Sequence, residues 1–274
     1  MTRLGTKNFG AIAAELLDRI RSKHPLIHHI TNWVVMNDTA NATLALGALP
    51  VMAHAREEVE EMVGAAGALV LNPGTLFPEL VEAMVMAGRR ANERGVPVVY
   101  DPVGVGATRY RNETGERLLK ELHIDVIRGN SGEIGALAGA GGVVKGVESV
   151  EGVADPQSVA RELARHRATV VAITGKRDIL SDGTRILGVD NGHEMLKTIT
   201  GSGCMATTAV AVFCAVESDK LIAAASALAC YGLAAERAAR GTKGPGSFRA
   251  SLLDELYHMT PALLEKGARV VPLA

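Results

Sequence analysis

Four polar residues stand at or just beyond the ends of three short apolar runs: Asp101, Arg128, Glu133 and Thr174. In an open parallel α/β sheet, ligands bind beyond the carboxyl ends of the strands, so these side chains are predicted to share one rim. Two carboxylates suit Mg²⁺ bound together with phosphate oxygens, and an arginine suits the negative charge of a nucleotide. Each residue alone could equally be a helix cap or a turn residue. As a set they favour phosphoryl transfer.

The phosphates of a nucleotide need a cradle, and no Gly-x-x-x-x-Gly-Lys-Ser/Thr motif supplies one here. The segment Thr200-Gly-Ser-Gly-Cys204 precedes a long uncharged stretch. Backbone N–H groups near Gly201 and Gly203 can approach an anion, and a helix start adds positive potential. The alternative is a glycine turn in which Ser202 caps the helix. Cys204 would lie in the first helical turn, a place that tends to lower a thiol pKa, whereas a nearby triphosphate would raise it.

A third cluster is rich in asparagine. Asn32, Asn37 and Asn41 recur at steps of four and five residues, so on a helix they would lie near one face and could line a polar pocket. Helix capping is an equally good interpretation of each. Met52 ends a short apolar run on the predicted rim and could pack on a flat ring, although a lone methionine is more often core filler.

Two other patterns are weak. His28 and His29 are adjacent, so on a strand they face opposite ways, and no carboxylate accompanies them at ligand spacing. We interpret them as structural. Gly104-x-Gly106 lacks the third glycine and the acidic partner of a dinucleotide-binding fingerprint.

Apolar periodicity predicts elements that alternate between helix and strand, which indicates an α/β fold with a mostly parallel sheet. Helices are expected at about 8–23, 34–47, 57–65, 77–94, 113–122, 131–139 and 156–166, and strands at 26–30, 50–53, 67–71, 97–100, 124–127 and 168–173. A Gly-rich loop is expected at about 139–153, and a hairpin around Ser181–Gly183 at the edge of the sheet. From Met205 onward the tail is predicted to be all helical, ending in a helix at about 248–266. No linker is visible, so residues 1–274 are expected to form a single domain.

Composition excludes several classes of protein. Lys and Arg number 29 against 30 Asp and Glu, so no basic excess exists for nucleic acid or anionic lipid. The longest uncharged stretch, 198–216, is too short in apolar residues to span a membrane. Three cysteines without a Cys-x-x-Cys pair argue against disulfides and zinc and favour the reducing cytoplasm.

Seven segments, in order along nearly the whole chain, closely resemble the hydroxyethylthiazole kinase family of the ribokinase-like superfamily. They are Thr31-Asn-x-Val-Val-x-Asn-x-Thr-Ala-Asn41, Leu44-Ala-Leu-Gly-Ala-x-Pro-Val-Met-Ala-His54, Asp101-Pro-Val-Gly-x-Gly106, Ile127-Arg-Gly-Asn-x-x-Glu-Ile134, Ile173-Thr-Gly175, Ile199-Thr-Gly-x-Gly-Cys204 and Gly244-Pro-Gly-Ser-Phe248. Ser202 and Leu49 depart from the residues that are commoner in this family at those positions.

The resemblance implies a three-layer ribokinase-like fold with helices on both faces of the sheet. It also implies ATP- and Mg²⁺-dependent phosphorylation of 4-methyl-5-(2-hydroxyethyl)thiazole, in a homotrimer with sites between subunits. The roles it implies are thiazole binding by Met52, Gly201 and Asn32, ATP binding by Arg128, Thr174 and Gly203, and Mg²⁺ binding by Asp101 and Glu133. Cys204 stands where most ribokinase-like enzymes carry an aspartate base.

Three other functions stay open from sequence. One is a kinase of the same fold for another hydroxylated heterocycle such as hydroxymethylpyrimidine. Another is a hydrolase in which Cys204 is the nucleophile and a histidine is the base. The third is a catalytically silent nucleotide sensor.

Overall fold

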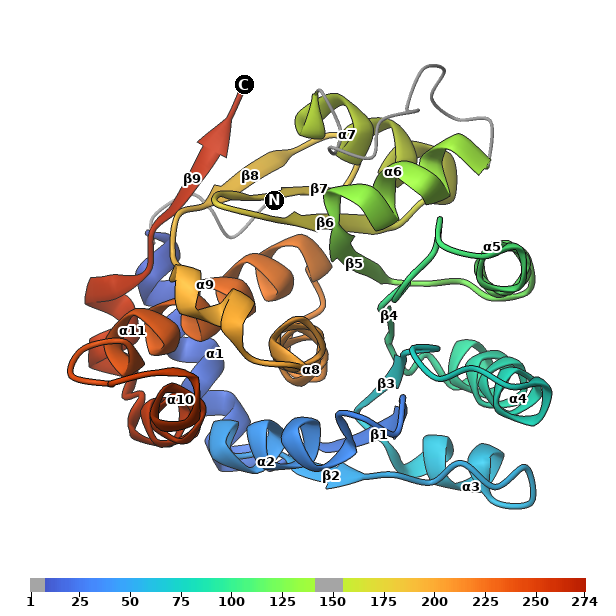
Figure 1. Ribbon diagram of the computed structural model, residues 1–274, viewed down its shortest axis with the longest axis horizontal. Coiled ribbons are helices and arrows are strands. Elements are labelled where there is room, and N and C mark those ends of the chain that lie inside the picture. Colours follow the sequence, from blue (N-terminus) through green and yellow to red (C-terminus); the bar gives the residue numbers. More distant parts are fainter. Residues whose placement is uncertain (1–7, 141–154) are drawn as a thin grey trace.

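The protein is described here by a computed structural model that covers residues 8–140 and 155–274. The described residues form a nine-stranded sheet in the order β2-β1-β3-β4-β5-β6-β7-β8-β9 (Figure 1). The first six strands of that order are parallel, and β7, β8 and β9 run antiparallel to their neighbours. The strands are β1 Leu26–Ile30, β2 Leu49–Val51, β3 Ala68–Leu71, β4 Val98–Tyr100, β5 Val126–Asn130, β6 Val170–Thr174, β7 Asp178–Ser181, β8 Ile186–Val189 and β9 Val270–Leu273.

Helices cover both faces of this sheet (Figure 1). One face packs against α1 (Phe9–Lys23), α2 (Met36–Leu46), α8 (Ser202–Cys214), α9 (Lys220–Ala238), α10 (Pro245–His258) and α11 (Pro261–Gly267). The other packs against α3 (Val59–Ala65), α4 (Pro78–Arg94), α5 (Arg109–Glu121), α6 (Ser131–Ala140) and α7 (Pro156–Arg167). Within β3, Val70 belongs to the first core and Leu69 and Leu71 to the second, because successive side chains of a strand point to opposite faces. The predicted three-layer α/β fold is confirmed.

Small side chains let α8 and α9 lie close together against the sheet. All residues of α8 from Met205 to Cys214 are buried. The 19-residue α9 is apolar and long enough to cross a membrane, but 89% of its most apolar window is buried inside the protein. In this structure α9 is therefore a core helix.

The predicted end of the chain is wrong in two respects. The expected helix at 248–266 is broken, because Pro261 lacks a backbone N–H and forces Thr260 into an extended conformation, φ −93° and ψ 155°. Thr260 then caps α11 by accepting a hydrogen bond from the Leu263 amide. The tail is not all helical either: β9 adds to β8, so the β7–β8 hairpin is not the sheet's edge.

Other boundaries differ less. Helix α5 begins at Arg109, four residues before the predicted start, where Thr108 accepts from the Arg111 amide. Most of the predicted Gly-rich loop at 139–153 lies outside the described residues, and residues 139 and 140 belong to α6.

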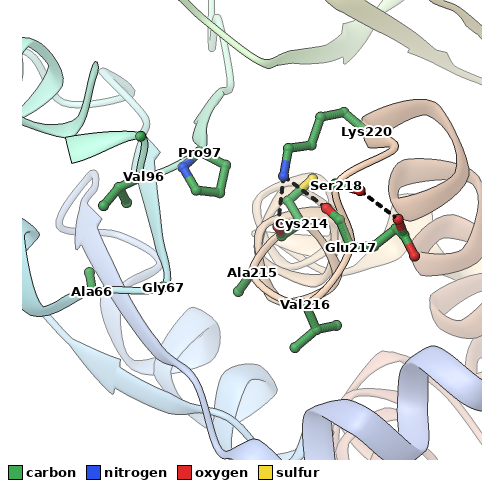
Figure 2. Close-up of a pocket in the computed structure, with 11 residues that line it drawn as sticks. Ala66, Gly67, Val96, Pro97, Cys214, Ala215, Val216, Glu217, Ser218 and Lys220 are labelled. Atoms are coloured by element: carbon green, nitrogen blue, oxygen red, sulfur yellow. Dashed lines mark hydrogen bonds between the residues drawn. The ribbon is translucent and has the colours of Figure 1, made fainter. Parts of the chain in front are cut away.

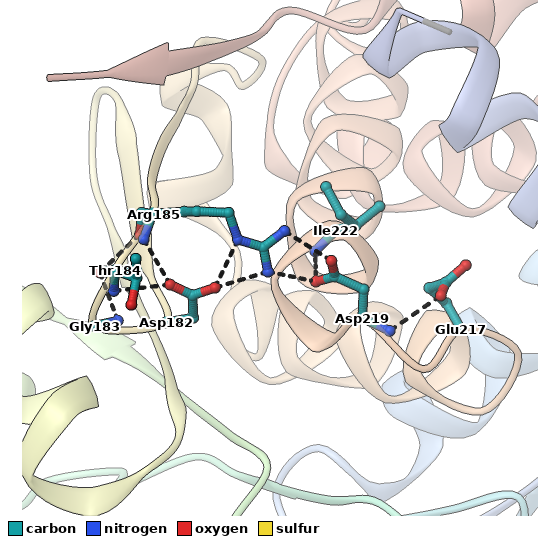
Figure 3. Close-up of polar contacts among 8 residues, drawn as sticks. Asp182, Gly183, Thr184, Arg185, Glu217, Asp219 and Ile222 are labelled. Carbon is teal, nitrogen blue, oxygen red and sulfur yellow. Dashed lines mark hydrogen bonds and ion pairs between the residues drawn. The ribbon is translucent and has the colours of Figure 1, made fainter. Parts of the chain in front are cut away.

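The β7–β8 hairpin is tied to α9 by one arginine (Figure 3). The Arg185 guanidinium donates to both carboxylate oxygens of Asp219, at 2.8 and 3.0 Å, and its Nε donates to Asp182 at 2.7 Å. Asp219 also caps α9 by accepting from the Ile222 amide. This ion-pair cluster holds the β7–β8 hairpin against the start of α9, in the part of the chain that follows α8.

Candidate active site

The carboxyl ends of the parallel strands carry a row of polar side chains in sheet order. Asn32 follows β1, Asn72 follows β3 and Asp101 follows β4, whereas Arg128 lies inside β5 and Thr174 is the last residue of β6. The predicted strand ends at 127 and 173 are therefore too early by three residues and one residue, and Arg128 and Thr174 do not follow their strands. The predicted common rim is found.

Asn72 is the centre of the hydrogen-bond network on this rim. Its amide nitrogen lies 3.1 Å from Asp101 Oδ2 and 3.2 Å from Cys204 Sγ, so its two N–H bonds serve a carboxylate and a thiol. The Asn32 amide donates to Asn72 Oδ1 at 2.9 Å and lies 3.8 Å from Cys204 Sγ. Thr207, one turn along α8, donates to Asp101 Oδ2 at 2.8 Å. Asn72 and Thr207 were not among the residues predicted from sequence, although Asn72 directly follows the apolar run at 67–71.

Burial sets the charge states in this network. Asp101 is 1% exposed, and desolvation raises its pKa to about 6 against the opposing pull of Arg128. Desolvation, reinforced by the Asp101 carboxylate, raises the pKa of Cys204 to about 12. The lowering favoured by a helix start is thus outweighed, because a buried thiolate loses its hydration. At neutral pH Cys204 is a thiol.

Arg128 joins the end of β6 to the start of α8. Its Nη2 donates to Thr174 Oγ1 at 2.6 Å, and its Nη1 stands 2.8 Å from where a Cβ on Gly203 would be. The side chain is nine-tenths buried, yet its Nε has no hydrogen-bond partner among the described residues. A buried guanidinium with an unused donor is suited to an anion.

The first turn of α8 has free backbone donors. The N-cap is Gly201, in the left-handed region at φ 83°, and among the described residues no side chain caps the first turn. The alternative in which Ser202 caps the helix is therefore wrong. The Ser202 carbonyl accepts a 2.9 Å hydrogen bond from Tyr231, which holds this turn against α9. Uncapped amides and the positive end of a helix dipole are suited to an anion.

The Glu133 carboxylate accepts hydrogen bonds from backbone N–H groups rather than from side chains. It forms a reciprocal cap with Asn130: Glu133 Oε2 accepts from the Asn130 amide and Asn130 Oδ1 accepts from the Glu133 amide, both at 2.9 Å. Its Oε1 accepts from Gly104 N at 3.0 Å, which anchors the loop that follows Asp101. The cap that sequence offered as an alternative is present, and the carboxylate still faces the Asp101 loop.

The structure does not bring every predicted residue into this network. Asn37 and Asn41 bond to each other on α2, and Asn32 precedes that helix, so the three do not share a helical face. Met52 is half-buried after the edge strand β2, where His54 Nε2 lies 3.1 Å from the backbone nitrogen and oxygen of Thr31.

The two adjacent histidines are buried within the protein. His28 Nε2 lies 2.7 Å from the Ala53 carbonyl, and His29 Nε2 lies 3.2 Å from Thr43 Oγ1. Burial lowers both of their pKa values. Within the part of the chain that the structure describes, no three His, Cys, Asp or Glu residues gather as a metal site.

A separate hollow lies at the opposite, amino-terminal edge of β3 and β4 (Figure 2). It is lined by Gly67, Val96 and Pro97, by Cys214 at the end of α8 and by residues 215–218 that follow it. The Lys220 ammonium beside it already donates to the carbonyls of Cys214 and Glu217. None of the rim residues lines it, so the chemistry suggested by the network does not belong there.

The comparisons with known proteins decide the family. The profile of the hydroxyethylthiazole kinase family matches residues 17–262. The chain belongs to this family. A hydroxyethylthiazole kinase of Desulforudis audaxviator is 67% identical over 257 residues, 94% of each chain, and one of Chloroflexus aggregans is 63% identical over 261 residues, 95% of this chain and 94% of that one.

Solved structures agree with this assignment. The hydroxyethylthiazole kinase protein of Pyrococcus horikoshii OT3 has a TM-score of 0.89 at 45% identity, covering 96% of this chain and 99% of that one. A ribokinase-like superfamily protein of Enterococcus faecalis has a TM-score of 0.63 at 12% identity, covering 90% of this chain and 95% of that one. That more distant likeness shows the ribokinase-like fold alone. This member of the hydroxyethylthiazole kinase family is a kinase, and kinases of this family use ATP.

Proposed function

We propose that this kinase transfers the terminal phosphoryl group of ATP to the hydroxyl of 4-methyl-5-(2-hydroxyethyl)thiazole, as in thiamine salvage. The observation that carries the proposal is the buried Arg128 beside the uncapped first turn of α8, next to the Asn72–Asp101–Cys204 network. Arg128 and the first turn of α8 can hold the phosphates, and the network around Cys204 can contact the attacking hydroxyl. The names of the close relatives support the choice of alcohol.

The nucleotide would be held from two strands and one helix. Arg128 and Thr174 offer a cation and a hydroxyl from neighbouring strands, and the amides of the α8 first turn, Gly203 included, offer donors at the positive end of the helix. A Cβ at Gly203 would collide with the Arg128 guanidinium, so this position must stay small.

The donor set fits one Mg²⁺. Asp101 Oδ1 accepts no hydrogen bond from a described residue, and Glu133 supplies a second carboxylate beside the same loop. Mg²⁺ typically takes one or two carboxylates and completes its shell with water and phosphate oxygens. When bound, the ion would offset negative charge on the transferred phosphoryl group.

Cys204 meets the substrate hydroxyl as a neutral thiol. A pKa near 12 leaves almost no thiolate at neutral pH, so the base role suggested by its position in the family does not suit the free enzyme. The Sγ accepts from the two amides, which leaves its S–H free to orient the alcohol together with Asn32. A loose phosphoryl-transfer transition state asks little of a base, because the nucleophile keeps its proton until late.

Cys204→Ala is therefore expected to lower kcat by roughly tenfold, below the range of general-base losses, and to change KM for ATP little. Cys214→Ala, a change on the same helix at a fully packed position, is the control and should change thermal stability but not kcat. Steady-state kinetics of both variants measure this. A Cys204→Ala kcat within about threefold of wild type would make Cys204 a packing residue.

The function itself is tested by Mg²⁺-dependent ADP release in the presence of a panel of small hydroxylated heterocycles. We expect release that requires the hydroxyethylthiazole. Preference for hydroxymethylpyrimidine would establish the alternative kinase, and binding of ATP without turnover of any alcohol would establish a sensor. A covalent acyl-enzyme at Cys204 without ATP use would establish the hydrolase. Equal release with and without alcohol would contradict the proposal.

We extend the proposal to a cytoplasmic homotrimer whose subunits share sites. Around α2 and β2 four large apolar side chains are exposed: Trp33 64%, Val34 62%, Leu44 52% and Leu49 48%. Such exposure next to an edge strand is typical of a surface that a partner covers. Met52 would then face substrate at the subunit boundary.

Activity and trimer content should fall together when the enzyme is diluted, because sites shared across a cyclic interface are lost on dissociation. Sedimentation velocity and assays over the same concentration series measure both. A fully active monomer would refute the shared site.

A further inference from the structure

Two loops carry the central pair of the rim. Asn72–Gly74 follows β3 and supplies Asn72, and the segment 101–107 follows β4 and supplies Asp101. The last backbone hydrogen bond between them runs from Asp101 N to Leu71 O at 2.9 Å. Beyond it, these two described loops make no backbone hydrogen bond with each other, so something else must fix their separation.

Arg111, on the first turn of α5, crosses that gap. Its Nη1 donates to the carbonyls of Pro73 at 3.2 Å and Val103 at 2.8 Å, and its Nη2 donates to that of Gly74 at 2.8 Å. Each arm ends beside a functional side chain. Gly74 N donates to Asn72 Oδ1 at 3.1 Å, and Val103 N donates to the Asp101 carbonyl at 2.8 Å.

Gly104 leaves room for the Arg111 side chain. A Cβ at Gly104 would stand 3.1 Å from its Cδ and Nη1, and Gly104 has a φ of 74°, so this glycine makes room for the side chain. Among the described residues Arg111 forms no ion pair, whereas Arg109 and Arg117 of the same helix pair with glutamates. The three hydrogen bonds of the Arg111 guanidinium all go to backbone carbonyls of the two loops.

We infer that Arg111 is a positioning residue that holds the two loops at the separation at which Asn72 donates to both Asp101 and Cys204. The inference rests on the proposed function for its kinetic part and on the structure alone for its geometric part. The planar fork matters because Nη1 bridges Pro73 and Val103 while Nη2 reaches Gly74, whereas a lysine would have to reach all three carbonyls from one atom on a flexible stem.

Kinetics of Arg111→Ala and Arg111→Lys give the first test, with Arg117→Ala as the matched control. Arg117 is on the same helix and also makes three guanidinium hydrogen bonds, to Glu82 and Glu121. We expect Arg111→Ala to lower kcat by roughly tenfold to a hundredfold, with KM for ATP changed less than about threefold, because Arg128 and Thr174 are untouched. Arg111→Lys should fall between, and added guanidinium should restore part of the Arg111→Ala activity.

The second test does not need activity. Cys204 is the partly exposed cysteine, whereas Cys214 and Cys230 are buried. Loosening of the Asn72 loop should raise the rate at which iodoacetamide alkylates Cys204 by about threefold or more in folded Arg111→Ala, but not in Arg117→Ala. Circular dichroism confirms that the variants compared are folded.

The outcomes separate the two claims. If wild type phosphorylates no alcohol but Cys204 alkylation still rises in Arg111→Ala, the proposed function fails and the positioning role stands. Equal kcat values in Arg111→Ala and Arg117→Ala, with lowered stability only, would make Arg111 merely structural. An unchanged alkylation rate, or full activity in Arg111→Lys, would also overturn the inference.

Discussion

Replacing Arg128 with glutamine is expected to lower kcat/KM for ATP by about a thousandfold, at the low end of the effects of arginines that stabilise a transferring phosphoryl group. The structure gives the reason. One arm of the guanidinium is committed to Thr174, while the buried Nε is unpaired and Nη1 lies against Gly203 at the start of α8. Glutamine keeps an amide donor but carries no charge, and its shorter side chain ends near the position of Nε rather than that of Nη2, which contacts Thr174.

Two further variants, one of Arg128 and one of its partner Thr174, separate the effect of the charge from that of the hydrogen-bond geometry. Arg128→Lys keeps the charge and should recover part of the loss, since a compact ammonium cannot bridge Thr174 and the α8 turn at once. Thr174→Val leaves Arg128 in place and should cost less than Arg128→Gln. Initial rates over a grid of ATP concentrations measure all three. A loss below about tenfold in Arg128→Gln would remove Arg128 from the nucleotide site.

The parallel strands could be predicted closely because burial on both faces makes them continuously apolar. The strand at 26–30 was predicted with its exact bounds, and those at 67–71 and 97–100 within one residue. The same rule fails where a polar residue lies inside a buried strand. Arg128 ended the predicted strand, yet it pairs with Ala172 inside the sheet, since its side chain finds a partner in Thr174.

β9 could not be predicted as a continuously apolar buried strand, because its residues are half-buried or exposed. Its partner β8 also lies some eighty residues away in sequence. Val270 and Val271 favour a strand locally, but only the packed helices between them and β8 bring the two segments together. The break before Pro261, by contrast, follows from a sequence rule, because a proline disfavours helical backbone at the residue before it.

The candidate site shows a similar division. Asp101 directly follows the apolar run at 97–100 and Asn72 directly follows the run at 67–71, so one sequence rule covers both residues. Arg111 has no such signal, since its partners are backbone carbonyls, which no residue type reveals. The pKa of Cys204 also lay beyond sequence, because it depends on burial and on a carboxylate a hundred residues away.

Asp101→Asn should lower kcat by at least about a hundredfold, the scale of losing one preorganised electrostatic group. Asparagine is nearly isosteric, so its oxygen can still accept from Asn72 and Thr207. What disappears is the negative charge that would bind Mg²⁺. The thermal stability of the ligand-free variant should not fall at neutral pH, because burial makes the ionised carboxylate costly in the native state. Activity and stability are thus expected to move apart.

The stability difference between Asp101→Asn and wild type should also depend on pH, in a direction that the pKa of Asp101 sets. The native pKa of Asp101, about 6, lies above its ordinary value of 3.8, so the native state binds this proton more tightly than the unfolded chain does. The stabilisation that wild type gains from the proton is complete below about pH 4 and is lost as pH rises through about 6. The Tm of Asp101→Asn minus that of wild type should therefore grow between about pH 4.5 and pH 7. Calorimetry of both proteins at the two pH values measures it. A difference that shrinks with rising pH would mean that Asp101 is stabilised as a carboxylate by Arg128, and that its charge is structural.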